Sequence, residues 1–123
     1  MRIKVFLQSI LIVPVVFFCL TPLPSRGATA RDNYDFYCTQ CHGLEGRGDG
    51  PNATESQPVD PRDHRSAYEM KKLNDDEIID VIKDGGAATS KSTLMPAFRR
   101  TLSDKEIEEL KDYLRELCKC QGV

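Results

Sequence analysis

The sequence of 123 residues contains no tryptophan, only two histidines and three methionines. Beyond residue 30 its middle is rich in glycine, proline and polar residues, so its side chains alone supply a thin hydrophobic core. No stretch in that part alternates convincingly between apolar and polar residues, which argues against β-strands. These shortages predict a small helical domain whose interior needs a further apolar body, much as other small domains need a metal or a disulfide.

The first 30 residues have the organisation of a secretory signal peptide. Met1–Lys4 carries two positive charges, an apolar run is densest over residues 10–20, and small residues follow. Cleavage after Ala30 fits an A-x-A site, and cleavage after Gly27 is the alternative. An uncleaved membrane anchor is less favoured, because polar residues and a proline leave an apolar run shorter than the about 20 residues that a bilayer helix needs. We therefore predict export to the periplasm and a mature domain over residues 31–123.

Two of the five cysteines form the motif C-x-x-C-H at Cys38-Thr39-Gln40-Cys41-His42, the attachment sequence of a c-type haem. Two thiols at this spacing can each add to one vinyl group of the same porphyrin, and His42 then lies where an imidazole nitrogen can bind the iron. A redox C-x-x-C does not need the histidine, and a zinc site needs two more ligands at similar spacing. We predict one haem c, bound covalently by Cys38 and Cys41. Bacteria attach this group outside the cytoplasmic membrane, in agreement with the leader.

Three helical stretches can be placed, of which the first is short and ends at the motif. The second runs from about Asp75 to Asp84: Asn74 is a good N-cap, Glu77 follows three residues later, and Gly85-Gly86 stop the helix.

The third helix has the clearest pattern. Ser103 caps it and Glu106 completes a capping box. Its opposite face is charged, and its apolar stripe consists of Ile107, Leu110, Leu114, Leu117 and Cys118.

Residues 43–72 are expected to be mostly loop. Four glycines lie close together at its start: Gly43, Gly46, Gly48 and Gly50. A phosphate-binding loop would need a preceding strand and a Lys-Ser/Thr pair that opens a helix, and neither is present. Glycine here is better explained as letting the backbone turn tightly against a flat ligand.

An iron held by His42 has one axial position left, and its occupant decides between electron transfer and ligand chemistry. Met95 lies 53 residues after His42 on a loop that Pro96 stiffens, from which a thioether can approach the opposite haem face. The alternative for Met95 is a core gap-filler. Met70, in a charged neighbourhood, is a weaker candidate, and His64 is expected to be a solvated loop histidine.

The sequence resembles the class I c-type cytochromes, in the subgroup of small bacterial members with a glycine-rich loop after the haem motif. The resemblance spans about residues 34–117 and rests on these matches: Tyr34, Cys38–Gly43, Gly46, Gly48–Pro51, Leu94–Phe98 and Tyr113–Arg115. It implies an all-α, cytochrome c-like fold, with three or more short helices and long loops wrapped around one covalently bound haem. It also implies His42 and Met95 as axial ligands, and a hydrogen bond from the other ring nitrogen of His42 to the Pro51 carbonyl.

A His/Met site leaves no vacant position for a substrate, so we expect a monohaem electron carrier of a respiratory chain and not an enzyme. The alternatives are a haem subunit of a larger respiratory redox enzyme, and a ligand-responsive haem protein in which Met95 detaches. Loss of the leader removes three positive charges and no negative ones, which changes the net charge from −2 to −5. That charge would steer the protein towards redox partners with basic docking surfaces. We expect no nucleic-acid partner, and contact with a membrane only through the leader before cleavage.

Cys118 and Cys120 are not required by the resemblance. Cys19 leaves with the leader, so these two are the thiols that remain in an oxidising compartment. They either bridge each other in a small ring, or Cys118 is buried on the helix while Cys120 pairs with another chain. We expect their role to be structural or incidental, and not functional.

Overall fold

The computed structural model describes residues 27–123. The predicted signal peptide therefore lies outside the described residues, except for its last four. The described part folds into helices and loops without a strand, which confirms the predicted all-α class. No helix in this part is long and apolar enough to cross a membrane. Its helices are α2 (Ala30–Tyr37), α3 (Thr39–His42), α4 (Ala67–Met70), α5 (Asp75–Ala88) and α6 (Asp104–Cys118).

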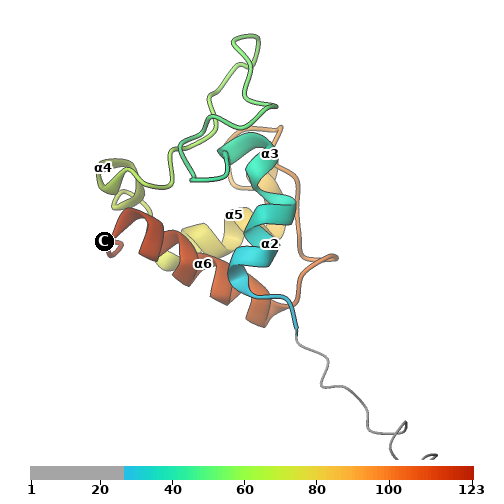
Figure 1. The fold of residues 1–123 in the computed structure, drawn as a ribbon, viewed down its shortest axis with the longest axis vertical. Helices are drawn as coiled ribbons and strands as arrows, with labels where there is room; N and C mark the ends of the chain where they lie inside the picture. Colours follow the sequence, from blue (N-terminus) through green and yellow to red (C-terminus); the bar gives the residue numbers. More distant parts are fainter. Residues whose placement is uncertain (1–26) are drawn as a thin grey trace, which may run out of the picture.

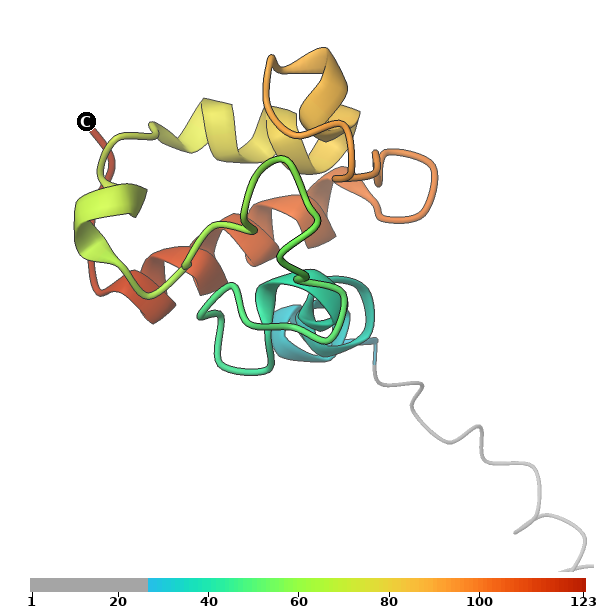
Figure 2. The same ribbon diagram turned by 90° about the horizontal axis from the view of Figure 1, so that it is seen from above.

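Helix α6 is the centre of the fold, because α2, α4 and α5 each pack against it. Figure 1 shows α2 running across α6. In Figure 2 α2 is seen nearly end-on, whereas α6 runs across the picture, so the two helices cross. The helices enclose one hydrophobic core, which consists of Tyr34, Met70, Leu73, Ile78, Ile82, Leu102, Ile107, Leu110, Leu114, Cys118 and Cys120. The crossing of the first and last helices, which the resemblance implied, is confirmed.

Helix α2 begins earlier than the predicted mature domain. The Thr29 side chain accepts a hydrogen bond from the backbone N–H of Asp32, and the Asp32 carboxylate accepts from the backbone N–H of Thr29, so a full capping box precedes the helix. The T-x-x-D spacing was readable in the sequence. Thr29 therefore takes part in the folded domain as the cap of α2.

Helices α5 and α6 start where the sequence predicted. Asn74 with Glu77, and Ser103 with Glu106, form capping boxes at their N-termini. Helix α5 runs nominally to Ala88, but Gly85 has φ +77°, so the regular helix is interrupted at the predicted stop.

Helix α4 was not predicted. Its N-cap is Ser66, whose hydroxyl accepts a hydrogen bond from the Glu69 backbone N–H, and its last residue, Met70, is 1% exposed in the core. The S-x-x-E spacing of a capping box was present in the sequence, but a single turn lacks an apolar period that would reveal it.

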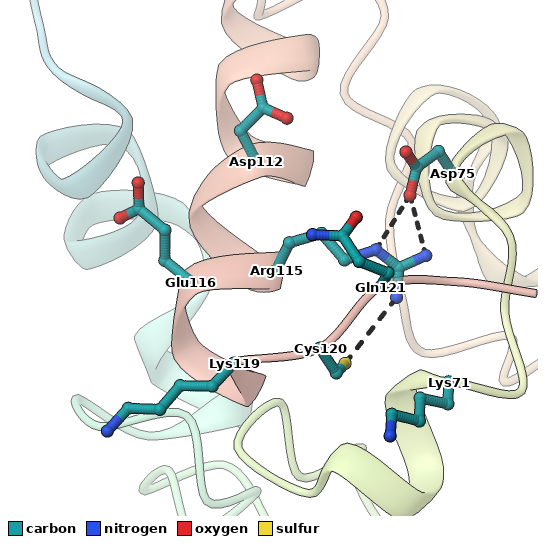
Figure 3. A pocket seen from close by; sticks show the side chains of 8 residues that line it. All are labelled: Lys71, Asp75, Asp112, Arg115, Glu116, Lys119, Cys120 and Gln121. Atoms are coloured by element: carbon teal, nitrogen blue, oxygen red, sulfur yellow. Dashed lines mark hydrogen bonds and ion pairs between the residues drawn. The ribbon is translucent and has the colours of Figure 1, made fainter.

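Arg115 connects α6 to the end of α4 and the start of α5, and Figure 3 shows its contact with Asp75. The guanidinium is 7% exposed and donates hydrogen bonds to the carbonyls of Met70 (2.9 Å) and Leu73 (2.7 Å) and to the Asp75 carboxylate (2.8 Å). The buried guanidinium therefore has hydrogen-bond acceptors for its charge, and it holds two backbone carbonyls and one carboxylate in place.

Cys118, the last residue of α6, forms a disulfide with Cys120, and both are buried. Lys119 between them has φ +51°, the left-handed conformation that commonly ends a helix. Of the two alternatives left open by the sequence, the intrachain bridge is the one that the structure contains.

Candidate functional site

Cys41 lies on α3, a single helical turn, and Cys38 is the residue that joins α2 to α3. The Cys38 backbone N–H donates to the carbonyl of Tyr34, so the motif is attached directly to the end of α2. Cys38 and Cys41 are free thiols and half-buried. Burial, together with the nearby Cys41 sulfur, raises the pKa of Cys38 to about 12. A reactive redox cysteine has a lowered pKa, so this environment argues against the redox interpretation of the C-x-x-C spacing.

His42 is oriented by a backbone carbonyl. Its Nδ1 lies 3.0 Å from the carbonyl oxygen of Arg62, and within the described residues Nε2 makes no hydrogen bond. Burial lowers the pKa of His42, with the Arg62 carbonyl acting in the opposite direction. A neutral imidazole with one nitrogen engaged and the other free is the form that binds a metal.

The carbonyl that holds His42 is not the predicted one. Pro51 is exposed, and its neighbours bond to the backbone of the motif helix: the N–H of Gly50 donates to Cys41 and the N–H of Asn52 to Gln40. These bonds keep Pro51 beside the main chain of α3, while Arg62 approaches the ring of His42. The predicted role of Pro51 is therefore wrong, because the loop passes the motif once at residues 50–52 and returns to it at residue 62.

The motif loop, residues 43–66, makes this return possible through glycine. Gly48 has φ +78°, and a Cβ atom there would collide with the Pro61 carbonyl oxygen. The N–H of Gly48 donates to the His42 carbonyl, and the N–H of His64 donates to the Gly46 carbonyl at 2.7 Å. The loop thus folds back on the motif through backbone contacts that side chains would prevent.

His64 is buried, not solvated as predicted. It is 8% exposed, and its Nδ1 lies 3.1 Å from the Tyr34 hydroxyl. Its ring lies face to face with the ring of His42, with centroids 4.1 Å apart and planes 18° apart. The backbone hydrogen bond to Gly46 holds His64 in the interior, and the Tyr34 hydroxyl gives its buried Nδ1 a hydrogen-bond partner.

Met95 lies on the loop between α5 and α6, residues 89–103, and is partly buried against the core. Its carbonyl accepts a hydrogen bond from Gly86 at 3.0 Å, and the N–H of Phe98 donates to the Ile82 carbonyl at 3.0 Å. A Cβ atom at Gly86 would collide with the Ser92 carbonyl oxygen. The Gly85-Gly86 pair therefore interrupts α5 and also lets the Met95 loop lie against it.

The motif and the Met95 loop meet through two aromatic rings. Tyr37, which directly precedes Cys38, contacts Phe98, with ring centroids 5.7 Å apart and planes 63° apart. This contact places the segments that carry the thiols and the thioether against each other. Met70, the weaker candidate ligand, is a fully buried core residue on α4.

The donor set fits a covalently attached haem. It consists of two free thiols on one helical turn, an imidazole with a free Nε2, and a partly buried thioether on an adjoining loop. The sequence did not indicate the Arg62 carbonyl, because every residue carries one. The Tyr34–His64 contact also had no local signal, since the two residues are 30 positions apart.

Comparison with known proteins gives a family match and similar solved structures. Residues 25–114 match the family described as "Cytochrome C oxidase, cbb3-type, subunit III". The chain is similar to the solved structure titled "KustC0563 c-type cytochrome", with 23% identity and a TM-score of 0.58 over 73% of this chain and 98% of that one. It is also similar to a chain of the Kuenenia stuttgartiensis reducing HAO-like protein complex Kustc0457/Kustc0458, with 30% identity and a TM-score of 0.59 over 77% of this chain. It spans 47% of that second chain. No curated protein matches the sequence.

Proposed function

The chain belongs to the family of cytochrome c oxidase, cbb3-type, subunit III, and we propose that it is a periplasmic, monohaem c-type cytochrome that carries single electrons between redox partners. Its fold is the predicted cytochrome c-like fold, and its cofactor is haem c, bound covalently. Haem c supplies an iron that alternates between ferric and ferrous states. We propose that transfer is outer-sphere, so that the protein holds and insulates the iron without binding a substrate.

The observation that carries this proposal is the arrangement of the motif. Cys38 and Cys41 are free thiols on one turn, and His42 beside them has its Nδ1 on the Arg62 carbonyl and its Nε2 free. In the proposal the two thiols would hold the haem, and His42 and Met95 would be the ligands of its iron. A neutral thioether favours ferrous iron and so raises the reduction potential.

Absorption spectra of protein produced with the haem-attachment machinery test the proposal. We expect low-spin haem c in both oxidation states, and no binding of carbon monoxide to the reduced protein at neutral pH. Met95→Ala should lower the potential and allow carbon monoxide to bind. Met70→Leu is the matched control, because it replaces a buried methionine with a residue of similar volume and should leave the spectra unchanged. Unchanged spectra in Met95→Ala would refute Met95 as the ligand.

A second candidate is that the chain is the haem subunit of a larger redox enzyme. The family description names an oxidase subunit, and one similar chain comes from a protein complex, where the match spans 47% of that chain. The mass of the native protein in solution separates the two candidates. A mass of a single mature chain supports the free carrier, and co-purification in a larger assembly supports the subunit.

We propose that the net charge of −5 directs the mature protein to partners with basic docking surfaces. The negative charge is unevenly placed: residues 74–80 carry four acids and no base, whereas residues 83–100, around Met95, carry four bases and one acid. Charge reversal at the exposed Asp76 and Asp80 should therefore slow electron transfer at low salt more than reversal at the exposed Lys91 and Arg100. The opposite order would indicate a partner with an acidic surface.

We propose that the leader is removed after Gly27 and not after Ala30. Cleavage after Ala30 would remove Thr29, whose hydroxyl caps α2, and would take away the first residue of the helix. Loss of such a cap costs about 1 kcal/mol. The intact mass of the exported protein decides between Ala28 and Arg31 as its first residue.

A further inference from the structure

We propose that His64 is a positioning residue for His42, and that Tyr34 holds His64 in this role. The inference rests on the proposed function, because it takes His42 as the ligand of the haem iron. His64 would act through His42, without touching the iron itself.

The first step is the contact between the two imidazoles. Their planes are 18° apart and their centroids 4.1 Å apart, so the face of His42 is covered by the face of His64. Two imidazoles on opposite sides of one iron would point at each other end-on. The face-to-face arrangement therefore places His64 beside His42, and excludes it as the opposing axial ligand in this conformation.

The second step is what this contact adds to the hydrogen bond from the Arg62 carbonyl. That bond, at 3.0 Å, fixes one corner of the His42 ring, Nδ1. A ring held at one corner retains a rocking motion about its bond to Cβ. With His64 against its face, such a rotation drives the ring edge of His42 into its neighbour. The carbonyl and the stacked ring together define the plane of the ligand.

The third step is what holds His64. Its backbone N–H donates to the Gly46 carbonyl at 2.7 Å, and its Nδ1 is 3.1 Å from the Tyr34 hydroxyl. Tyr34 is 0% exposed, and among residues 27–123 its only other hydrogen-bond partner is the Gly43 carbonyl, at 3.5 Å. The Tyr34 hydroxyl and the His64 Nδ1 are therefore each other's main hydrogen-bond partner.

The fourth step links this contact to the rest of the fold. The ring of Tyr34, on α2, packs edge-on against Tyr113 of α6, with centroids 5.3 Å apart. A continuous series of ring contacts therefore runs from α6 through Tyr34 and His64 to His42. The crossing of α2 and α6 is packed through the hydrophobic core, so the plane of the ligand is linked to that core.

The test uses the full haem-loaded protein and three variants: His64→Ala, His64→Phe and Tyr34→Phe. His64→Ala removes the stacked ring, His64→Phe keeps a flat ring without its polar edge, and Tyr34→Phe removes only the hydroxyl. The readouts are the reduction potential and the g values of the ferric protein in electron paramagnetic resonance, which depend on the orientation of the ligand plane. Ile78→Ala, a core truncation on α5, is the control for general loss of stability.

We expect His64→Ala to lower the ferrous-to-ferric ratio about tenfold at a fixed applied potential. For a one-electron couple this is a fall of about 59 mV in the reduction potential. The reason is that water reaches the exposed face of His42 and favours the more charged ferric site. The g values should change in the same variant. His64→Phe should restore most of both properties, Tyr34→Phe should give a smaller change in the same direction, and Ile78→Ala should give none.

A haem-loaded His64→Ala variant with wild-type potential and g values would overturn the inference, as would an equal change in Ile78→Ala. If His64→Ala does not accumulate, Tyr34→Phe decides, and an unaltered Tyr34→Phe overturns the inference. Failure of the proposed function looks different: the wild-type protein itself would then lack the low-spin spectrum of a histidine-ligated haem.

Discussion

Helices α5 and α6 bury their apolar side chains in a shared core, whereas none of the buried hydrophobic residues lies in the motif loop, residues 43–66. The loop is held mainly by backbone hydrogen bonds to the motif helix and by the close approach of glycines to other main-chain atoms. Its buried residues are three glycines and one histidine. The helices are therefore ordered by burial, and the loop by contacts that require the motif beside it to be in place.

This difference separates the two tasks of the chain. A helical core resists local change, because each apolar residue contacts several others. A loop ordered by backbone contacts can follow the outline of a flat cofactor, but it contributes little stability of its own. Cofactor attachment should therefore order the loop much more than the helices.

The largest expected effect comes from removing the cofactor. The double variant Cys38→Ala/Cys41→Ala leaves no thiol for attachment, so the motif loop should become accessible to protease while much of the helical circular dichroism remains. The cleavage sites, mapped by mass spectrometry, should fall within residues 43–66. If the helices unfolded as completely as the loop, the two regions would form one cooperative unit, and the difference between them would be refuted.

The second largest effect should come from the core. Leu110→Ala truncates a residue that is 2% exposed on α6, and we expect it to lower the free energy of unfolding by about 2–5 kcal/mol. Denaturant titration of the haem-loaded protein measures this loss. The visible spectrum should not change, because the truncation lies in the helical core and not at the ligands. A shifted spectrum would mean that the core and the site are not separable.

A smaller effect is expected at the contact between α5 and the Met95 loop. Gly86→Ala places a Cβ atom against the Ser92 carbonyl, so the loop must move, at a cost of about 1–3 kcal/mol. The absorption band that reports methionine ligation should weaken, while the helical circular dichroism is retained. Ala87→Gly, at the next and exposed position, is the control. An unaltered band would show that the loop tolerates the displacement.

The smallest effect should come from the cap of α6. Ser103 donates to the Glu106 carboxylate through its hydroxyl and its backbone N–H, and these bonds lower the pKa of Glu106 below its ordinary value of 4.5. A lowered folded-state pKa means that the stabilisation is complete above pH 4.5 and is lost as the pH falls through the lowered value. Unfolding of Glu106→Gln should be less sensitive to acid than that of the wild-type protein, as thermal melts between pH 6 and pH 3 would show. Parallel pH curves would contradict this.

The same division decides what could be predicted from the sequence. The starts of α5 and α6 were predicted at Asn74 and Ser103, because capping boxes and apolar stripes are local patterns. The haem motif and the position of Met95 on a loop were also local. Whether Met95 binds the iron stays a prediction.

Long-range backbone contacts were not predictable. The carbonyl that orients His42 belongs to Arg62 and not to Pro51, and the choice depends on how the motif loop returns. The burial of His64 depends on the same return. Helix α4 and the cap at Thr29 were different, since each had a readable capping signal that was overlooked.

Arg115 has a consequence for the order in which the chain can fold. The carbonyls of Met70 and Leu73 and the Asp75 carboxylate lie at least 40 residues before the guanidinium that binds all three. Until Arg115 is available, the two carbonyls lack this buried donor and the start of α5 is not tied to the last helix. The contacts between α4, α5 and α6 therefore form only when nearly the whole chain is present, so a chain truncated before Arg115 should not complete the domain.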